Sequence, residues 1–288
     1  IRGNAVVESL YARFMCAPFL SLLVDDCIEN GRDYNAGGAR YNTSYIQGVG
    51  IGTVTDALAA IKAQVFTEHT VGLGGLVEAM RRNFVGSDAL RHALRERSPK
   101  YGNDDDSADS IMRRVFAEVL DAVDGRPNVR GGTYRLDMLP TTCHVYFGSV
   151  TGASADGRYA GQPVSEGISP VQGCDRRGPT AVLLSAAKMD HAATGGTLLN
   201  LKFTPKLLEG DEGIDNLAHL VRTYFSLGGH HIQFNVVKVE TLLEAQKDPD
   251  RFRDLIVRVA GYSDYFCDLS RALQDEIIAR TEHEAFGA

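Results

Sequence analysis

The feature that most constrains the fold of this chain is a change of pattern near residue 133. Up to that point the sequence reads as mostly helical. Four β-like runs follow it, at 138–150, 179–189, 195–205 and 230–239. Glycine-rich loops and one helical pattern at 213–228 separate these runs, and strands that alternate with helices are typical of α/β domains. We therefore predict an α/β fold in two parts, residues 1–132 and residues 133–288.

The first part contains two stretches that superficially suggest ligand sites. Gly48, Gly50 and Gly52 resemble a phosphate loop ahead of the helical run TVTDALAAIKAQVF. The apolar strand that should precede such a loop is missing, which argues against nucleotide binding. The acidic run 104–106 lacks the ligand spacing of an EF-hand. We assign it to a helix N-terminus, where carboxylates complement the helix dipole.

Composition and charge exclude several classes of protein. The net charge of -7 and the pI near 5.6 argue against a nucleic-acid binder, which usually carries a basic stripe. No apolar run approaches the ~18 residues of a membrane span. We find no signal peptide, so we expect a cytoplasmic protein. The five cysteines form no CxxC pair, so we expect neither disulfides nor a metal site.

The run HIQFNVV places polar side chains on one face of a predicted strand. His231, Gln233 and Asn235 alternate with apolar residues, and successive side chains of a strand point to opposite faces. Such a row fits the wall of a polar cavity. It fits equally well the solvated outer face of an antiparallel strand.

A glycine in the run RVAGYSDYF, residues 258–266, raises a different question. Gly261 lies among bulky apolar residues, in a turn without the usual Asn-Gly or Pro-Gly pair. A tight turn that tolerates only a residue without Cβ is one explanation. The spacing by itself does not distinguish this explanation from a functional one.

The run RVAGYSDYF resembles the glycyl-radical signature of the pyruvate formate-lyase-like enzymes. Further segments of that family occur in family order and cover nearly the whole chain. They are GGARYNTSYIQGVGIGTVTDALAAIK, PKYGNDDDSAD, DGRYAGQPVSEGISPVQGCDRRGPTAVLLSAAKMDHAATGGTLLN and GGHHIQFNVV. The chain departs from the narrower signature at Asp264, where a small residue is preferred. This departure points to the lyase and dehydratase branch of the family.

The resemblance implies that Gly261 stores an organic radical on its Cα. Such a radical is delocalised over the flanking amide and carbonyl and needs a planar Cα, which a side chain would oppose. Arg258, Tyr262 and Tyr265, with Phe266, are expected to pack the radical loop. The implied fold is the C-terminal half of an α/β barrel with surrounding helices, with Gly261 directed toward its centre.

The family also uses a catalytic cysteine in a context like G-C-x-E, which none of the five cysteines shows. Cys174, in QGCDR, is the nearest imitation, but it lies in the wrong place in chain order. The chain begins without Met, inside a helical pattern. We therefore expect a C-terminal portion of a longer enzyme, inactive by itself, with the thiyl cysteine upstream.

The resemblance leaves several functions open. We expect elimination of water, an amine or sulfite from a small hydroxylated substrate. One alternative is formate C-acetyltransferase activity. Another is a non-catalytic spare-part protein that donates a fresh glycyl loop to a damaged enzyme. An open reading frame continuing upstream into a G-C-x-E loop would favour the longer enzyme over a separate protein.

The partners follow from the same resemblance, whereas the substrate contacts are predicted from polar side chains in β-like runs beside apolar neighbours, where a buried polar group needs a partner. We expect no bound cofactor, a homodimer when the protein is full length, and a radical S-adenosylmethionine activating enzyme with an iron–sulfur cluster that installs the radical. Because a guanidinium suits an anionic group, Arg135 is expected to bind such a group, although a surface arginine is an equal alternative. The predicted substrate-binding residues are Arg135, His144, Asn200, His231 and Gln233.

Overall fold

The computed structural model describes residues 1–286 and divides them into two compact units. Unit 1 comprises residues 1–47, 117–137 and 193–195, and unit 2 comprises the remainder of the described chain. These units do not follow the predicted boundary near residue 132, because both are built from separate stretches of sequence. The division into residues 1–132 and 133–288 stays a prediction.

Unit 1 contains a short parallel strand pair and, near the N-terminus of the chain, two helices. Strand β1, Thr43–Gln47, pairs in parallel with β2, Thr133–Asp137. Helix α1 covers Arg2–Phe14 and α2 covers Pro18–Leu23. The opening helical pattern is therefore two helices instead of one. Pro18 explains the break, since proline lacks the N–H that a continuing helix needs and is tolerated in a first turn.

Unit 2 contains most of the helices. Helix α6, Asp106–Val123, begins in unit 2 and ends in unit 1. The others are α3 Ile51–Ile61, α4 Leu73–Arg81, α5 Asp88–His92, α7 Cys143–Val150, α8 Gly178–Ala187, α9 Gly210–Ser226, α10 Val239–Lys247 and α11 Arg271–Ala279.

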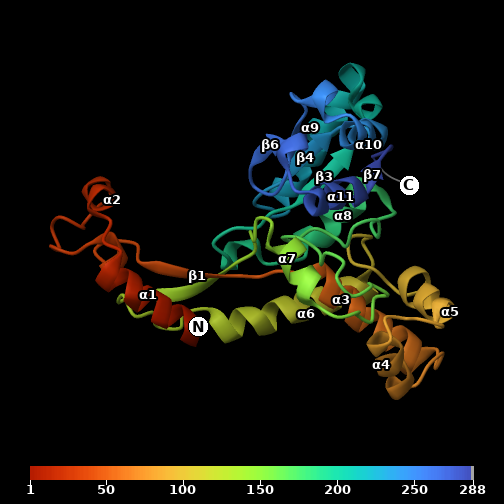
Figure 1. Ribbon diagram of the computed structural model, residues 1–288, viewed down its shortest axis with the longest axis horizontal. Coiled ribbons are helices and arrows are strands. Elements are labelled where there is room, and N and C mark those ends of the chain that lie inside the picture. The colour runs from red at the N-terminus through yellow and green to blue at the C-terminus, as the bar shows by residue number, and fades with distance from the viewer. Residues whose placement is uncertain (287–288) are drawn as a thin grey trace. The chain divides into compact units, whose positions relative to one another are not determined.

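Two small sheets lie in the C-terminal part of unit 2, where Figure 1 shows them close to α9, α10 and α11. Strand β3, Asn200–Phe203, is central and pairs in parallel with β4, Gln233–Val236, and with β7, Glu282–His283. Strands β5, Ile256–Arg258, and β6, Ser263–Tyr265, form an antiparallel hairpin. All four residues of β3 are buried, as expected of a central parallel strand.

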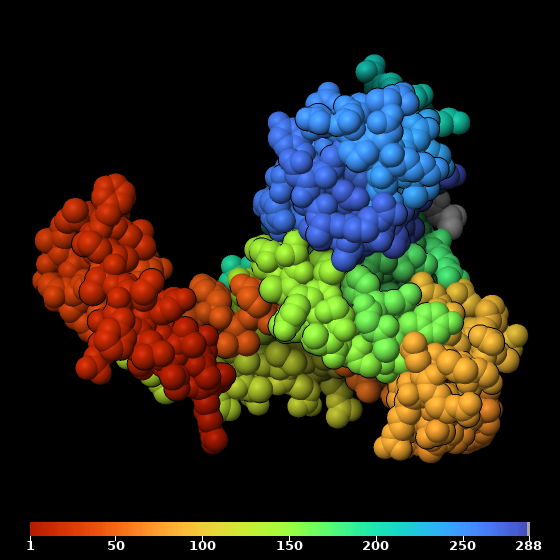
Figure 2. Space-filling view, viewed as in Figure 1, coloured from red at the N-terminus to blue at the C-terminus, as the bar shows by residue number. Residues whose placement is uncertain are grey.

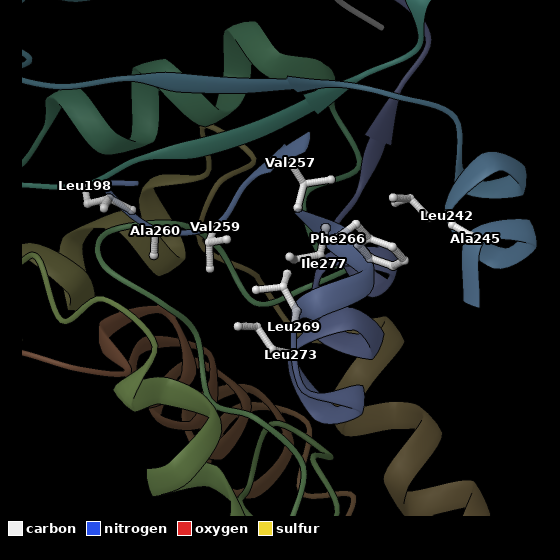
Figure 3. Packing of buried hydrophobic residues seen from close by; sticks show 10 residues of the cluster. All are labelled: Leu198, Leu242, Ala245, Val257, Val259, Ala260, Phe266, Leu269, Leu273 and Ile277. Carbon is white, nitrogen blue, oxygen red and sulfur yellow. The ribbon is translucent and has the colours of Figure 1, made fainter. Parts of the chain in front are cut away.

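The hairpin is packed onto α10 and α11 by a hydrophobic cluster, drawn in Figure 3. Val257 lies within β5 and Phe266 directly follows β6, and both side chains are almost fully buried. Burying side chains of this size stabilises a fold by about 1.5–3 kcal/mol each. The same region forms a compact blue mass in Figure 2. The cluster consists of Leu198, Leu242, Ala245, Val257, Val259, Ala260, Phe266, Leu269, Leu273 and Ile277.

Two of the four predicted β-like runs are helices. The run 138–150 contains α7, and the run 179–189 forms α8. A continuous apolar run does not distinguish a buried helix from a buried strand, because its periodicity is lost when every side is covered. Six of the ten residues of α8 are buried, which explains the error. The runs at 195–205 and 230–239 contain β3 and β4, as predicted.

The mixed α/β class is confirmed. The strands of residues 1–286 form three separate sheets, two parallel and one antiparallel, so the barrel stays a prediction. Among the described residues, no helix is both long enough and apolar enough to cross a membrane.

Candidate radical site

Gly261 lies in the tight turn that joins β5 to β6. The Val259 N–H donates to the Tyr262 carbonyl at 2.9 Å, and Gly261 has a φ of 81°, in the left-handed region that favours glycine. A Cβ built on Gly261 would lie 3.4 Å from Leu198 Cδ1 and 3.8 Å from Leu139 Cδ2. The space around Gly261 would accept a methyl group. The turn therefore favours glycine for its backbone conformation and not for lack of space.

The side chain of Asn235, on β4, fastens the end of β5. Asn235 Oδ1 accepts from the Arg258 N–H at 2.7 Å, and Asn235 Nδ2 donates to the Arg258 carbonyl at 2.7 Å. A side-chain amide carries a donor and an acceptor on adjacent atoms, which matches the N–H and the carbonyl of one residue. The polar face of β4 is therefore neither solvated nor an open cavity wall at this position, since it holds the glycine hairpin.

Three predicted site residues form a connected chain of hydrogen bonds beneath the turn. Arg258 Nε donates to Gln233 Oε1 at 2.9 Å, and Gln233 Nε2 donates to Asn200 Oδ1. Asn200 Nδ2 in turn donates to the Val259 carbonyl at 3.4 Å. Gln233 and Asn200 are both buried, and buried polar groups need such partners. The structure thus brings together Gly261, Asn200, Gln233 and Arg258.

A buried ion pair at the end of α11 completes the surroundings of the turn. Arg280 makes two parallel bonds to Glu276, with Nε at 3.1 Å from Oε1 and Nη2 at 2.8 Å from Oε2. Arg280 Nη2 also lies 2.9 Å from the Val259 carbonyl. Burial by itself would raise the pKa of Glu276, but Arg280 and His144 outweigh burial and hold this pKa well below its ordinary value.

A second buried carboxylate, Glu166, lies beside this pair. Its Oε1 accepts from Asn200 Nδ2 at 2.6 Å and from Ser169 Oγ at 2.7 Å. Burial raises the pKa of Glu166, although Arg280 and His144 oppose this shift. Two carboxylates therefore share one guanidinium, and the pKa values of the two carboxylates are shifted in opposite directions.

His144, another predicted site residue, is fully buried at the start of α7. Its Nε2 lies 3.5 Å from Glu276 Oε1. His231 precedes β4 and is half-buried, and burial, followed by the charge of Arg258, lowers the pKa of its imidazole. The geometry thus connects His144 with the ion pair, whereas the link of His231 to Arg258 is the charge of the guanidinium alone.

The remaining predicted site residues are Arg135, in the other unit, and the aromatic residues that follow Gly261. Arg135, on β2, belongs to unit 1, where its Nε lies 2.6 Å from Asp124 Oδ1. Its charge is already balanced there, and its contact with substrate stays a prediction. Tyr262 is 39% exposed and Tyr265 is 45% exposed, so their shielding of the radical loop stays a prediction as well. Phe266 is fully buried.

The cysteines of unit 2 are Cys143, Cys174 and Cys267. None of them lies within 4 Å of the position of a Gly261 Cβ, since in the described part of unit 2 only Leu198 and Leu139 have atoms that close, apart from the chain neighbours of the glycine. Burial raises the pKa of the Cys174 thiol to about 12, which disfavours a thiolate there. Across residues 1–286, no cluster of three or more His, Cys, Asp or Glu side chains could hold a metal ion.

The sequence reasoning missed Glu166, Glu276 and Arg280. The sequence did contain a sign of the pair Glu276 and Arg280, because the two residues are four positions apart. They lie on the face of α11 that carries the buried residues Leu273 and Ile277. Charged residues on an apolar helix face are almost never fully buried unless they are paired. Only the tertiary structure shows that this pair reaches the glycine turn.

The two bonds between Asn235 and Arg258 lead to a prediction. Asn235→Asp keeps the acceptor but replaces the donor with a second oxygen, which faces the Arg258 carbonyl. We expect the free energy of unfolding to fall by about 1–3 kcal/mol, the cost of an unsatisfied buried group, in a denaturant titration. Asn216→Asp, on an exposed position of α9, makes the same charge change and should have little effect. Equal losses for the two variants would contradict the role of Asn235.

Comparison with known protein families identifies the family of the chain. The model of the pyruvate formate lyase-like family matches residues 1–148, and that of the glycine radical domain matches residues 164–267, which include Gly261. The chain belongs to the pyruvate formate lyase-like family. The turn at Gly261 lies within its glycine radical domain.

Relatives of the chain are glycyl radical dehydratases and lyases. Trans-4-hydroxy-L-proline dehydratase of Clostridioides difficile is 59% identical over 98% of this chain and 36% of its own length. Its crystal structure with substrate bound superposes with a TM-score of 0.96 at 58% identity, over 98% of this chain and 36% of that chain.

More distant relatives act on other small molecules. Isethionate sulfite-lyase of Oleidesulfovibrio alaskensis is 41% identical over 97% of this chain and 34% of its own length. The glycerol-bound, B12-independent glycerol dehydratase of Clostridium butyricum superposes with a TM-score of 0.93 at 44% identity, over 96% of this chain and 35% of that chain. The chain thus spans about a third of the length of these relatives.

Proposed function

We propose that this chain is the radical-storing part of a glycyl radical dehydratase and that Gly261 carries the radical. The observation that supports this role is the turn itself. Gly261 lies at its tip, within the matched glycine radical domain, while Asn200, Asn235 and Arg280 hold the two residues at the end of β5 and the start of the turn. A radical centre needs a fixed backbone and no side chain, and the turn supplies both.

The reaction requires a thiol that faces the glycine. In the proposed sequence, the Gly261 radical takes a hydrogen atom from a cysteine, and the thiyl radical takes one from the substrate carbon beside the hydroxyl-bearing carbon. The hydroxyl group leaves as water with a proton from a neighbouring N–H or O–H of the substrate, and the product radical regains a hydrogen atom from the cysteine. The thiyl radical then takes a hydrogen atom back from the Gly261 Cα, which restores the glycyl radical. Leu198 and Leu139, and none of the described cysteines of unit 2, lie next to the Cβ position of Gly261, and the chain spans about a third of its relatives, so we propose a thiol in a further part of a longer protein.

Installation of the radical needs a partner. We propose a radical S-adenosylmethionine activating enzyme with an iron–sulfur cluster, which removes one hydrogen atom from the Gly261 Cα. Gly261 and Tyr262 lie at the exposed end of the hairpin, which suits access by such a partner. The same reasoning, carried over from the family, proposes a homodimer for the full-length protein.

For the substrate, we propose a hydroxylated amino acid of the trans-4-hydroxy-L-proline type. The identity of 59% to the dehydratase that acts on this compound supports the choice over a sulfonate or a neutral diol, whose enzymes are more distant. Arg135, paired with Asp124, provides no separate support for a sulfonate.

The test uses the full-length protein, activated anaerobically with the activating enzyme, S-adenosylmethionine and a reductant. We expect kcat/KM for trans-4-hydroxy-L-proline to exceed that for glycerol or isethionate by ~100-fold or more, because polar groups that bind one substrate are left unpaired by another. Substrate loss is followed by chromatography, and sulfite release is measured separately.

The competing functions give different results in this assay. Faster sulfite release from isethionate would move the protein to the sulfite-lyase class. Formate production from pyruvate and coenzyme A would establish the acetyltransferase alternative, and both results would contradict the dehydratase proposal.

A further inference from the structure

Helix α11 holds the glycine hairpin on both of its sides. On the side after the turn, Gln274 Nε2 donates to the Phe266 carbonyl at 2.9 Å and to the Leu269 carbonyl at 3.2 Å. On the side before the turn, Arg280 donates to the Val259 carbonyl at 2.9 Å and to the Arg258 carbonyl at 3.3 Å. The backbone on each side of Gly261 is thus tied to one helix through two side chains.

Arg280 is suited to this task by its geometry and by its surroundings. Its guanidinium is a rigid planar fork with five N–H donors. Nε and Nη2 donate to the Glu276 carboxylate, while Nη1 and the same Nη2 donate to the carbonyls of the hairpin. Glu276 is itself held by Gln172 Nε2, which donates to its Oε1 at 3.0 Å. Glu276 therefore holds the guanidinium in a fixed orientation, in which its remaining N–H groups point at the hairpin backbone.

We propose that Arg280 is a positioning residue for the radical, which keeps the Gly261 turn closed by holding the carbonyls of Arg258 and Val259. The proposal rests on the proposed function of Gly261 as the radical store. Arg280 does not touch the glycine Cα, and it acts through the backbone of the two preceding residues. Its loss should open the turn locally while the sheet beneath it stays in place.

The size of the effect follows from the bonds that are lost. A hydrogen bond from a charged donor is among the stronger bonds of a protein interior, and its loss corresponds to a factor of roughly 10–150 in an equilibrium constant. The open form of the turn should become more populated by such a factor. In the full-length protein, where we propose that a further part of the chain faces Gly261, reaction of the radical with oxygen should rise in proportion when opening is fast and reversible.

The test uses Arg280→Lys and Arg280→Met/Glu276→Gln in the full-length protein. The lysine variant keeps the charge but lacks the fork, and the double variant removes both charges, so that neither group is left buried and unpaired. Amide hydrogen exchange should become at least ~10-fold faster at Arg258 and Val259 in both variants, with little change in β3 and α9. The glycyl radical signal in electron paramagnetic resonance should decay about 10-fold faster on limited exposure to oxygen.

Arg271→Met is the matched control. Arg271 forms an ion pair with Asp275 across four residues of the same helix, as Arg280 does with Glu276, but on the exposed surface. Exchange and radical decay should match those of the unmodified protein. Unchanged exchange at Arg258 and Val259 in both Arg280 variants, or equally faster exchange throughout unit 2, would overturn the proposal. The exchange measurement does not need a radical, so a missing radical signal in the unmodified protein would count against the proposed function only.

Discussion

Gly261→Ala is expected to abolish both the glycyl radical signal and turnover while the protein still folds. The added methyl group would meet Leu198 Cδ1 at 3.4 Å, which is an ordinary contact distance. The remaining cost is the left-handed backbone at a φ of 81°, about 1–2 kcal/mol for a residue with a side chain. A loss of this size leaves a folded protein. The absence of a radical would therefore follow from the chemistry at the Cα.

The measurement is electron paramagnetic resonance after anaerobic activation, with thermal unfolding as a check of the fold. Gly228→Ala is the matched control, because Gly228 follows α9 at a φ of 93° and has open space around it. It imposes the same type of backbone cost without touching the radical site. A doublet signal that survived in Gly261→Ala would place the radical on another residue.

The sequence predicted the elements whose pattern is local. Helix α9 and strands β3 and β4 are correct, because amphipathic spacing or a short apolar run bounded by turns is visible within a few residues. Helices α7 and α8 were predicted as strands, because a short apolar run reads alike in a helix and in a strand, and burial of most of α8 hides its period. The hairpin of β5 and β6 was missed. Its strands are three residues each, and tertiary packing on α10 and α11 decides their conformation.

The same distinction applies to the site. Gly261 was found through a resemblance of sequence, and Asn200 and Gln233 through their position in apolar runs. Their actual task, which is to hold the backbone of the turn, could not be predicted, because it depends on which strand lies beside the hairpin. Glu166 comes from a loop more than 100 residues before Glu276 in the sequence, and only folding brings both carboxylates to Arg280.

Glu276→Ala is expected to cause a large loss of stability, because it leaves the Arg280 guanidinium buried without its main counter-charge. Breaking a buried ion pair by removing one partner typically costs about 3–5 kcal/mol. Glu166 offsets part of this cost, since its carboxylate already interacts with Arg280. Asp275→Ala, one residue earlier on α11, removes the partner of Arg271 at the exposed surface, where ion pairs are worth about 0–1 kcal/mol. Denaturant unfolding of the two variants at pH 7 should separate them clearly.

The pH dependence gives an independent check of the same pair. The pKa of Glu276 is lower in the folded protein than in the unfolded chain, where a glutamate has a pKa of about 4.3. The contribution of the pair is therefore fully present above about pH 4.3 and is lost as the pH falls through the folded pKa. Glu276→Gln removes this titration, so its stability should decline less steeply than that of the unmodified protein below pH 4.3. Parallel curves for the two proteins below that pH would mean that Arg280 does not stabilise the Glu276 carboxylate.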